Sequence, residues 1–165
     1  MIDRRLLLLG GGGAAVIAGV TWLRGGDVEA AGPFETVKSD DEWRRILKPA
    51  EYRVLRQHGT EQPYSSPLNG EKREGTFACV GCDLPLFSSG TKFESGTGWP
   101  SFYAPLKNAV GTSVDRSLLI ARTEVHCRRC GGHLGHVFND GPPPTGRRYC
   151  MNGVALKFIP TDPPA

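Results

Sequence analysis

The sequence predicts a mainly β domain preceded by short helices. Its 165 residues are enough for one compact domain with a hydrophobic core. Its 22 glycines and 13 prolines favour many turns and short strands over a bundle of long helices. From residue 60 onward, short apolar segments alternate with Gly, Pro, Asn and Ser, as they do between the strands of a sheet.

Residues 1–31 have the layout of an export signal. Arg4 and Arg5 precede an apolar, glycine-rich stretch from Leu6 to Leu23, and Val28-Glu29-Ala30 offers a cleavage site. The paired arginines suggest the twin-arginine export route. The alternative is an uncleaved membrane anchor, because about 18 apolar residues just span a bilayer. Both interpretations predict that the rest of the chain is exported, with a periplasmic location.

Charged residues are spread along the chain without a basic block. Lys and Arg number 20 against 17 Asp and Glu, which gives a formal net charge of +3. Nucleic-acid-binding domains cluster their positive charge on one face or along one helix. We therefore expect no nucleic-acid partner. We also expect a monomer, which contacts a membrane only through an uncleaved N-terminal segment.

Residues 32–60 are predicted to form a helical lead-in. Ser39 and Glu42 have the spacing of a capping box, which indicates the start of a helix. The apolar positions that follow on one helical face are Trp43, Ile46 and Leu47.

A second helix is predicted from about Pro49 to His58. Its apolar residues Tyr52 and Leu55 are three positions apart, and Gly59 is the expected C-cap.

Residues 61–160 are predicted to form a zinc-containing β catalytic domain, followed by a short tail at 161–165. Gly75–Ala78 and Ser117–Ala121 are two of the segments with the pattern of strands.

Four of the five cysteines form two C-x-x-C pairs. Two residues between cysteines let both sulfurs face one ion from a tight turn, and two such turns complete a tetrahedral zinc site. Such a closed site has no open position for chemistry, so the predicted zinc ion is structural. The predicted ligands are Cys79, Cys82, Cys127 and Cys130.

Two alternatives to this zinc site exist in the sequence. A pair of disulfides is compatible with an oxidising compartment. A mixed site would leave the first C-x-x-C pair without a role and would use Cys127, Cys130, His133 and His136.

The fifth cysteine, Cys150, is a candidate nucleophile. On a strand, the period of two places Arg148, Cys150 and Asn152 on one face. A guanidinium beside a thiol favours the thiolate, which is the reactive form, most strongly where the site is partly shielded from water. The alternative is a buried structural thiol, which is common for free cysteines.

Two further segments carry candidate site residues. His133 and His136 are possible proton donors near neutral pH, although a pair of histidines is also common in structural and metal sites. The loop from Ser95 to Phe102 is fixed by Gly and Pro and presents Trp99, although an ordinary turn with a core tryptophan has the same pattern.

Together, these motifs resemble the methionine-R-sulfoxide reductases, the MsrB family, in order and spacing over about residues 36–160. Several motifs in register are far more specific than any one of them. The matching segments are Cys79-x-x-Cys82, Ser95 to Phe102, Cys127-x-x-Cys130, His133 to Pro142 and Arg148 to Asn152.

The resemblance implies two antiparallel sheets packed together, with zinc remote from the active centre. It implies that the Cys150 thiolate attacks the sulfoxide sulfur, which releases methionine and leaves a sulfenic acid. His133 and His136 would bind or protonate the sulfoxide oxygen, because an unprotonated oxide is a poor leaving group. Trp99 would pack against the sulfur-bound methyl group, with Phe138 as a second substrate-binding residue.

The resemblance also gives roles to residues around the nucleophile. Arg148 would favour the thiolate, while Asn152 and Asp140 would order the hydrogen bonds around the histidines. The implied enzyme is a peptide-methionine (R)-S-oxide reductase that repairs oxidised proteins under oxidative stress. Its partners would be proteins that contain methionine sulfoxide.

The chain departs from one family pattern at Thr97. Many members carry a resolving cysteine at this position of the glycine loop. With four cysteines assigned to zinc and Cys150 to catalysis, none remains to form an intramolecular disulfide. We therefore expect an external thiol, thioredoxin-like or smaller, to reduce the sulfenic acid.

Two other functions stay open on the residues alone. A noncatalytic zinc module would recognise a partner through the surface around Trp99, because a fold does not by itself give an activity. A thiol peroxidase would use Cys150 to reduce hydrogen peroxide and would show no preference between sulfoxide epimers.

Overall fold

The computed structural model describes residues 34–117 and 120–161. The predicted export signal and residues 162–165 of the predicted tail lie outside the described residues. Within the described part of the chain, no helix combines the length and the apolar character needed to cross a bilayer.

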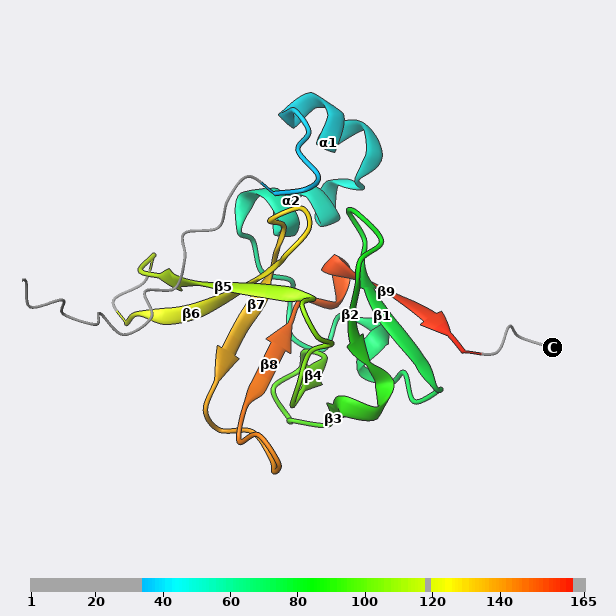
Figure 1. Ribbon diagram of the computed structural model, residues 1–165, viewed down its shortest axis with the longest axis vertical. Coiled ribbons are helices and arrows are strands. Elements are labelled where there is room, and N and C mark those ends of the chain that lie inside the picture. The colour runs from blue at the N-terminus through cyan, green and yellow to red at the C-terminus, as the bar shows by residue number, and fades with distance from the viewer. Residues whose placement is uncertain (1–33, 118–119, 162–165) are drawn as a thin grey trace, which may run out of the picture. The chain divides into compact units, whose positions relative to one another are not determined.

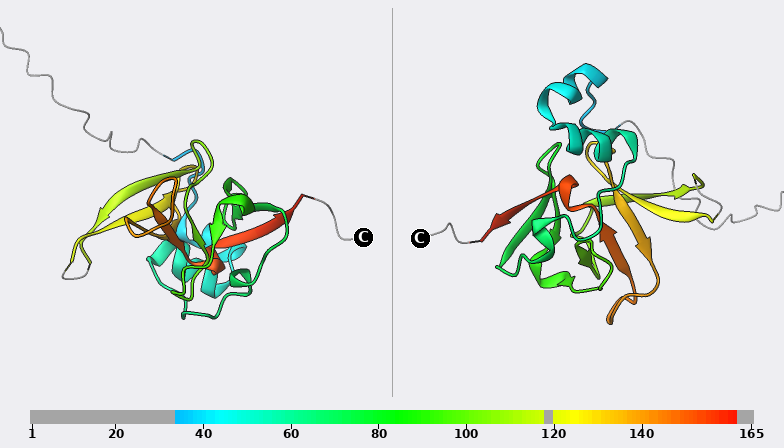
Figure 2. Two further views of the ribbon diagram at one scale, coloured as in Figure 1. Left: turned by 90° about the horizontal axis from the view of Figure 1, so that it is seen from below. Right: turned by 180° about the vertical axis from the view of Figure 1, so that it is seen from behind.

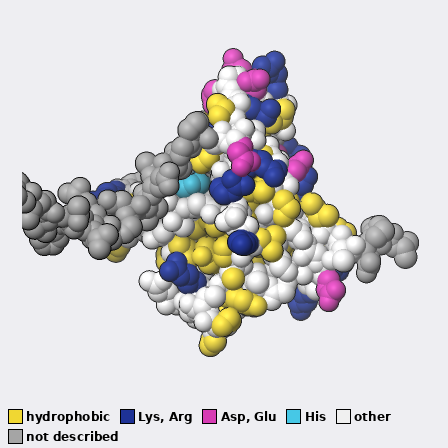
Figure 3. Space-filling model, in the orientation of Figure 1, with side chains coloured by type: hydrophobic (Ala, Val, Ile, Leu, Met, Phe, Trp, Pro, Cys, Tyr) yellow, Lys and Arg dark blue, Asp and Glu magenta, His cyan; other side chains and the backbone are white. Residues whose placement is uncertain are grey.

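The two predicted helices are present as α1 (Asp40–Ile46) and α2 (Pro49–Gln57). Ser39 caps α1 through the capping box with Glu42, as predicted. Acidic and basic side chains lie side by side at this end of the molecule (Figure 3), as in the ion pair of Asp40 with Arg44.

Two details of the helix predictions were wrong. Ile46 is 55% exposed, whereas Trp43 and Leu47 are buried, because α1 ends at Ile46 and presents only a narrow apolar face to the core. The left-handed C-cap of α2 is His58 (φ 54°) and not the glycine that follows it.

A three-stranded antiparallel sheet has the order β2-β1-β9. Its strands are β1 (Gly75–Cys79), β2 (Pro85–Ser88) and β9 (Leu156–Pro160), so the last described strand pairs with the first one (Figure 1).

A six-stranded antiparallel sheet has the order β3-β4-β8-β7-β6-β5. Its strands are β3 (Lys92–Phe93), β4 (Ser101–Phe102), β5 (Val110–Asp115), β6 (Arg122–Cys127), β7 (His133–Phe138) and β8 (Arg148–Met151). Figure 2 shows the β5–β6 hairpin reaching away from the three-stranded sheet.

Three short 3-10 helices lie in the connections between the described strands and helices. They are η1 (Pro67–Asn69), η2 (Ser89–Thr91) and η3 (Gly153–Ala155).

These two sheets confirm the predicted mainly β fold with short N-terminal helices. The predicted strand at Gly75–Ala78 is β1. The predicted strand at Ser117–Ala121 was wrong, because β5 ends at Asp115 and β6 begins at Arg122. Ile120 is 77% exposed in this connection, so its apolar side chain does not indicate a core strand. Residues 118–119 lie outside the residues that the structure describes.

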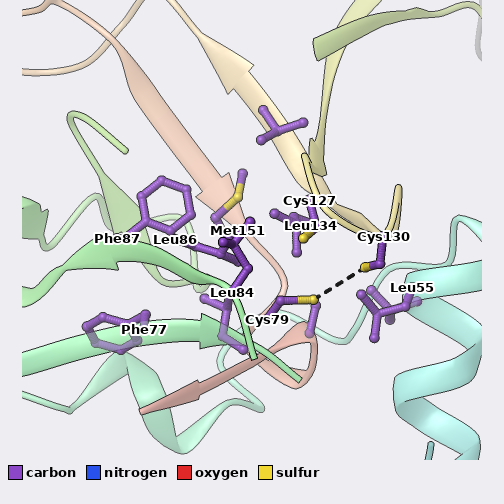
Figure 4. Packing of buried hydrophobic residues seen from close by; sticks show 14 of the residues in the cluster. Leu55, Phe77, Cys79, Leu84, Leu86, Phe87, Cys127, Cys130, Leu134 and Met151 are labelled. Carbon is purple, nitrogen blue, oxygen red and sulfur yellow. Dashed lines mark hydrogen bonds between the residues drawn. The ribbon is translucent and has the colours of Figure 1, made fainter. Parts of the chain in front are cut away.

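The core lies between the two sheets. Phe77 of β1 and Phe87 of β2 pack against Phe102 of β4, with ring centroids 5.0 and 4.4 Å apart. Burial of such aromatic side chains is the main stabilising contribution to a fold of this size. Tyr149 and Met151 of β8 point into the same core (Figure 4 labels Met151), so the other face of β8 presents Arg148 and Cys150 on the outer side of the sheet.

The pairing of β7 with β8 positions the candidate nucleophile. Cys150 is directly opposite His136 on one side and Ser101 on the other. The two backbones approach closely at Gly135, where a Cβ atom would lie 2.2 Å from the carbonyl oxygen of Cys150. A glycine is therefore required for this register.

The Gly135→Ala substitution should lower the free energy of unfolding by about 1–3 kcal/mol, because the added methyl group forces the two strands apart. The matched control is Gly90→Ala, whose Cβ would have its nearest neighbour, the Ser88 hydroxyl, at 3.6 Å. The control should stay within about 0.5 kcal/mol of the wild type in urea denaturation. Equal stability of the two variants would contradict this account of the register.

Candidate active site and metal centre

The sulfur atoms of four cysteines gather at one point between the two sheets. The Sγ atoms of Cys79, Cys82, Cys127 and Cys130 all lie within 4.8 Å of one another. Cys79 and Cys130 are separated by 3.8 Å between sulfurs (Figure 4), and Cys82 and Cys127 by 3.5 Å. Tetrahedral zinc with Zn–S bonds of about 2.3 Å requires sulfurs about 3.8 Å apart, so the cluster fits such an ion.

The two C-x-x-C turns have the same backbone conformation. The N–H of Asp83 donates to the carbonyl of Cys79, and the N–H of Gly131 donates to that of Cys127. Asp83 (φ 63°) and Gly131 (φ 67°) both adopt the left-handed conformation, which turns the chain back behind each pair.

The cluster connects the two sheets. Cys79 is the last residue of β1 and Cys127 is the last residue of β6, so an ion bound here would join one sheet to the other. The mixed ligand set of the sequence analysis is not brought together, because His133 and His136 bond to Glu124 and Asp115 instead.

Cys150 lies in a cavity of about 120 Å³ on the outer face of the six-stranded sheet. The cavity is separate from the four-cysteine cluster, none of whose residues lines it. The structure brings together five residues that the sequence analysis assigned to this site, and adds three others. The lining residues are Thr60, Trp99, Arg122, Gly135, His136, Phe138, Cys150 and Asn152.

Trp99 is held by hydrogen bonds to the loop that follows α2. Its Nε1–H donates to the backbone carbonyl of Glu61 at 3.2 Å. The Glu61 carboxylate accepts hydrogen bonds from the backbone N–H groups of Gly153 and Val154, and burial raises its pKa. This network fixes the aromatic wall of the cavity.

Asn152 lies just beyond the end of β8 and is buried. Its Oδ1 accepts from the backbone N–H of Glu61 at 2.9 Å, and its Nδ2 donates to the carbonyl of Leu134 at 3.1 Å. Asn152 thus ties the Trp99 network to β7. Its described side-chain bonds go to these backbone groups and not to the histidines, contrary to expectation.

Both candidate histidines turn away from the core because β7 is irregular. On a regular strand, residues three apart point to opposite faces. The pairing of β6 with β7 shifts register between Val125 and His126, which is a β-bulge. As a result, the rings of His133 and His136 meet edge-on with centroids 5.4 Å apart.

His136 bonds to the carboxylate of Asp115. Its Nε2 lies 2.7 Å from Oδ2, and Arg122 contacts the same oxygen at 2.6 Å. Hydrogen bonds from Ser117, and then from His136 and Arg122, hold the pKa of Asp115 well below its usual range. Burial lowers the pKa of His136, and the bond to Asp115 opposes this effect.

His133 does not line the Cys150 cavity. It is buried behind His136, and its Nδ1 lies 2.7 Å from Oε1 of Glu124. The bond to His133 is the largest cause that lowers the pKa of Glu124 to about 2.

Arg148 and Asp140 form a bidentate ion pair at the edge of the site. The two hydrogen bonds measure 2.9 and 2.8 Å, and the guanidinium stacks over Phe138 with its centre 4.4 Å from that ring. Asp140 raises the pKa of Arg148, with a smaller contribution from Cys150. The expected role of Asp140 in the histidine network was wrong, because its side chain bonds to Arg148.

A chain of hydroxyl groups reaches the Cys150 sulfur. Thr97 Oγ1 lies 3.8 Å from Sγ and 2.8 Å from the Ser95 hydroxyl, which is also 2.8 Å from the hydroxyl of Ser101. Thr97 is thus adjacent to Cys150.

Comparisons with known proteins decide the family. The SelR domain model matches residues 47–160. The chain belongs to the MsrB family. Proteins named peptide methionine sulfoxide reductase MsrB match it from Pseudomonas putida (strain W619), with 56% identity over 126 residues, 76% of this chain and 95% of the relative. The match from Methanosarcina barkeri is 55% identical over 122 residues, 73% of this chain and 86% of the relative. These findings confirm the predicted family, whose members are oxidoreductases acting on sulfur.

Sequence reasoning missed the carboxylates of this MsrB-family site. Glu124 faces His136 across β6 and β7, and Asp115 faces Arg122 across β5 and β6. The alternating polar residues Arg122 and Glu124 were a usable signal of a half-exposed strand. Glu61 carried no local pattern that would have marked it.

The Glu124→Gln variant tests the carboxylate beneath His133. Because the folded-state pKa of about 2 is below the ordinary value of 4.5, the ionised group stabilises the fold above pH 4.5. This stabilisation is lost as the pH falls from 4.5 towards 2. The variant should therefore be less stable than the wild type at pH 6, and the gap should narrow at pH 3 in urea denaturation. A constant gap would contradict the assigned ion pair.

Proposed function

We propose that this chain reduces methionine-R-sulfoxide in oxidised proteins to methionine, with Cys150 as the nucleophile. The observation that carries the proposal is the position of Cys150 in the cavity, opposite His136 in the sheet and beside Trp99. A thiol, an imidazole and an aromatic wall are the groups that this reduction needs. The MsrB relatives are named for the same chemistry.

The first step transfers oxygen from the substrate to the enzyme. The Cys150 thiolate attacks the sulfoxide sulfur, and the S–O bond of the substrate is replaced by an S–O bond on Cys150. Methionine leaves, and Cys150 becomes a sulfenic acid. The substrate sulfur is reduced by two electrons and the enzyme sulfur is oxidised by two.

His136 is the proposed proton donor to the sulfoxide oxygen. The ionised carboxylate of Asp115 can only accept a hydrogen bond, so the Nε2 of His136 carries a proton towards it. A donor at the other ring nitrogen, Nδ1, therefore requires the imidazolium. Burial lowers the pKa of His136, and the bond to Asp115 offsets part of this effect in favour of the charged form. His133 packs edge-on against this ring and acts as a positioning residue.

Trp99 and Phe138 are the proposed walls for the methyl group of the substrate. Both rings line the cavity, and sulfur-bound groups are attracted to aromatic rings. One wall for the methyl group and one donor for the oxygen fix two of the substituents on the chiral sulfur, which favours one epimer. Arg148 shares the outer face of β8 with Cys150, so its guanidinium is the proposed partner of the Cys150 sulfur.

An external thiol is the proposed reductant for the sulfenic acid. Cys150 is flanked by Thr97, and the other four cysteines are gathered at the metal cluster. One external thiol would form a mixed disulfide with Cys150 and release water. A second thiol would then restore the Cys150 thiol. A thioredoxin-like protein or a small thiol supplies these electrons.

Zinc is the proposed ion for the four-cysteine cluster. The sulfur spacing and the all-thiolate donor set fit a closed tetrahedral site, in which zinc stabilises the fold and leaves the chemistry to Cys150. We further propose that the enzyme is an exported, periplasmic monomer that repairs oxidised proteins, with residues 1–31 as its signal or anchor.

The Cys150→Ser variant should lose at least about a thousandfold in kcat for methionine-R-sulfoxide peptides with dithiothreitol as reductant, because a hydroxyl is a poor nucleophile here. The variant should keep one zinc ion per chain by metal analysis. Residual turnover near that of the wild type would contradict the proposal. In the wild type, equal activity on the two sulfoxide epimers, or faster turnover of hydrogen peroxide than of the sulfoxide, would support a thiol peroxidase instead.

The fate of the sulfenic acid separates external from internal recycling. In the wild type treated with sulfoxide but no reductant, a sulfenic-acid trap should label Cys150, as seen by mass spectrometry. In Thr97→Cys, the new thiol should form a disulfide with Cys150 and abolish labelling, because the native side chains are 3.8 Å apart. Thr97→Ser should behave as the wild type. A stable disulfide from Cys150 to another cysteine of the wild type would contradict external recycling.

A further inference from the structure

We propose that His58, Glu124 and His133 form a second metal site, which takes one divalent transition metal ion of the zinc class. The three ligand atoms lie within 4.8 Å of one another. They come from the end of α2, from β6 and from β7, so the fold assembles them from three separate segments. The site is distinct from the four-cysteine cluster and from the Cys150 cavity.

The ligand set suits an ion of this class. Two imidazoles and one carboxylate are the protein ligands of many open zinc sites, in which water takes the fourth position. The Nδ1 atoms of His58 and His133 lie 3.0 and 2.7 Å from the same oxygen, Oε1 of Glu124. Tetrahedral bonds of about 2.1 Å require ligand atoms about 3.4 Å apart, so both imidazoles must move outward from this oxygen by less than about 1 Å to admit the ion.

The Glu124 carboxylate is oriented so that one of its oxygens can bind a cation. Both histidines approach the same oxygen of Glu124, Oε1. The Ser113 hydroxyl donates to its second oxygen, Oε2, at 2.6 Å. A partner of this kind orients a metal-binding carboxylate and leaves the first oxygen facing the two histidines.

The site is open to solvent on one side. The three ligands line a hollow of about 430 Å³, which leaves room for water on the ion. The His58 side chain is 66% exposed and can move aside to admit an ion, whereas His133 is held in place by burial. Asp115, which also lines the hollow, is already bonded to His136 and Arg122.

Metal binding here would inhibit the reductase, a consequence that depends on the proposed function. An ion on His133 fixes the ring that packs edge-on against His136 and brings positive charge close to it. An ion here would therefore restrain the ring from which the sulfoxide oxygen would take its proton. The inferred inhibitor of the reductase is therefore a free divalent transition metal ion that binds at His133.

Binding can be measured with cobalt, whose visible spectrum reports its ligands. The full chain, with the four cysteines saturated with zinc, is titrated with Co²⁺. We expect one further ion per chain with a d–d spectrum and without a sulfur-to-cobalt charge-transfer band. His58→Asn should weaken the affinity at least tenfold, because one protein ligand is lost, while Asn is well suited to the left-handed C-cap at φ 54°. The control His126→Asn should bind as the wild type.

Several outcomes would overturn the inference. No bound cobalt at millimolar concentration would mean that the three residues form only a hydrogen-bonded bridge. Equal affinity of the wild type and His58→Asn, with thermal unfolding showing both folded, would place the ion elsewhere. A charge-transfer band would place it on thiolates, which would count against the four-cysteine zinc site as well.

The inhibition has its own readout. Added Zn²⁺ should lower the reductase activity of the wild type and of His126→Asn, and His58→Asn should need at least tenfold more Zn²⁺ for half-inhibition. Equal inhibition of all three proteins would contradict the inference. A complete lack of reductase activity in the wild type would instead contradict the proposed function, while the cobalt titration would still decide whether the metal site exists.

Discussion

The close pairing of β7 with β8 is the constraint on which the site depends. Gly135 lets the two backbones meet, and this contact sets Cys150 opposite His136 on the outer face of the sheet. The inner face of β8 packs into the core, so the proposed nucleophile lies on a strand that cannot shift without disturbing that packing. A metal ion held by the four-cysteine cluster would add a second constraint, because it would join the sheet of β1 to the sheet of β6.

The bulge in β7 is as important as the pairing. It turns two histidines three residues apart to the same side of the sheet, where His136 faces Cys150 and His133 packs against His136 from behind. Each ring then has its own carboxylate: Asp115 for His136 and Glu124 for His133. Because both carboxylates come from the β5–β6 hairpin, that hairpin is part of the active-site structure and not only an edge of the sheet.

Features that depend on local spacing were predictable from the sequence. The capping box at Ser39, the two C-x-x-C turns and the face that Cys150 shares with Arg148 all follow from turn chemistry or from the period of a strand. Features that depend on the register between strands were not predictable from the sequence. The partners of the histidines are residues 9 and 21 positions away, and they arrive through strand pairing. Asp140 was assigned to the histidines only by resemblance, whereas its side chain bonds to the guanidinium of Arg148, eight residues further along the chain.

A crystal structure of Cys150→Ser with a bound peptide that contains methionine-R-sulfoxide tests the central claim most directly. The account predicts that the sulfoxide sulfur contacts the serine hydroxyl, with its oxygen within hydrogen-bonding distance of His136 Nδ1 and its methyl group against Trp99. A sulfoxide bound outside the cavity, or with its oxygen turned away from His136, would contradict the account.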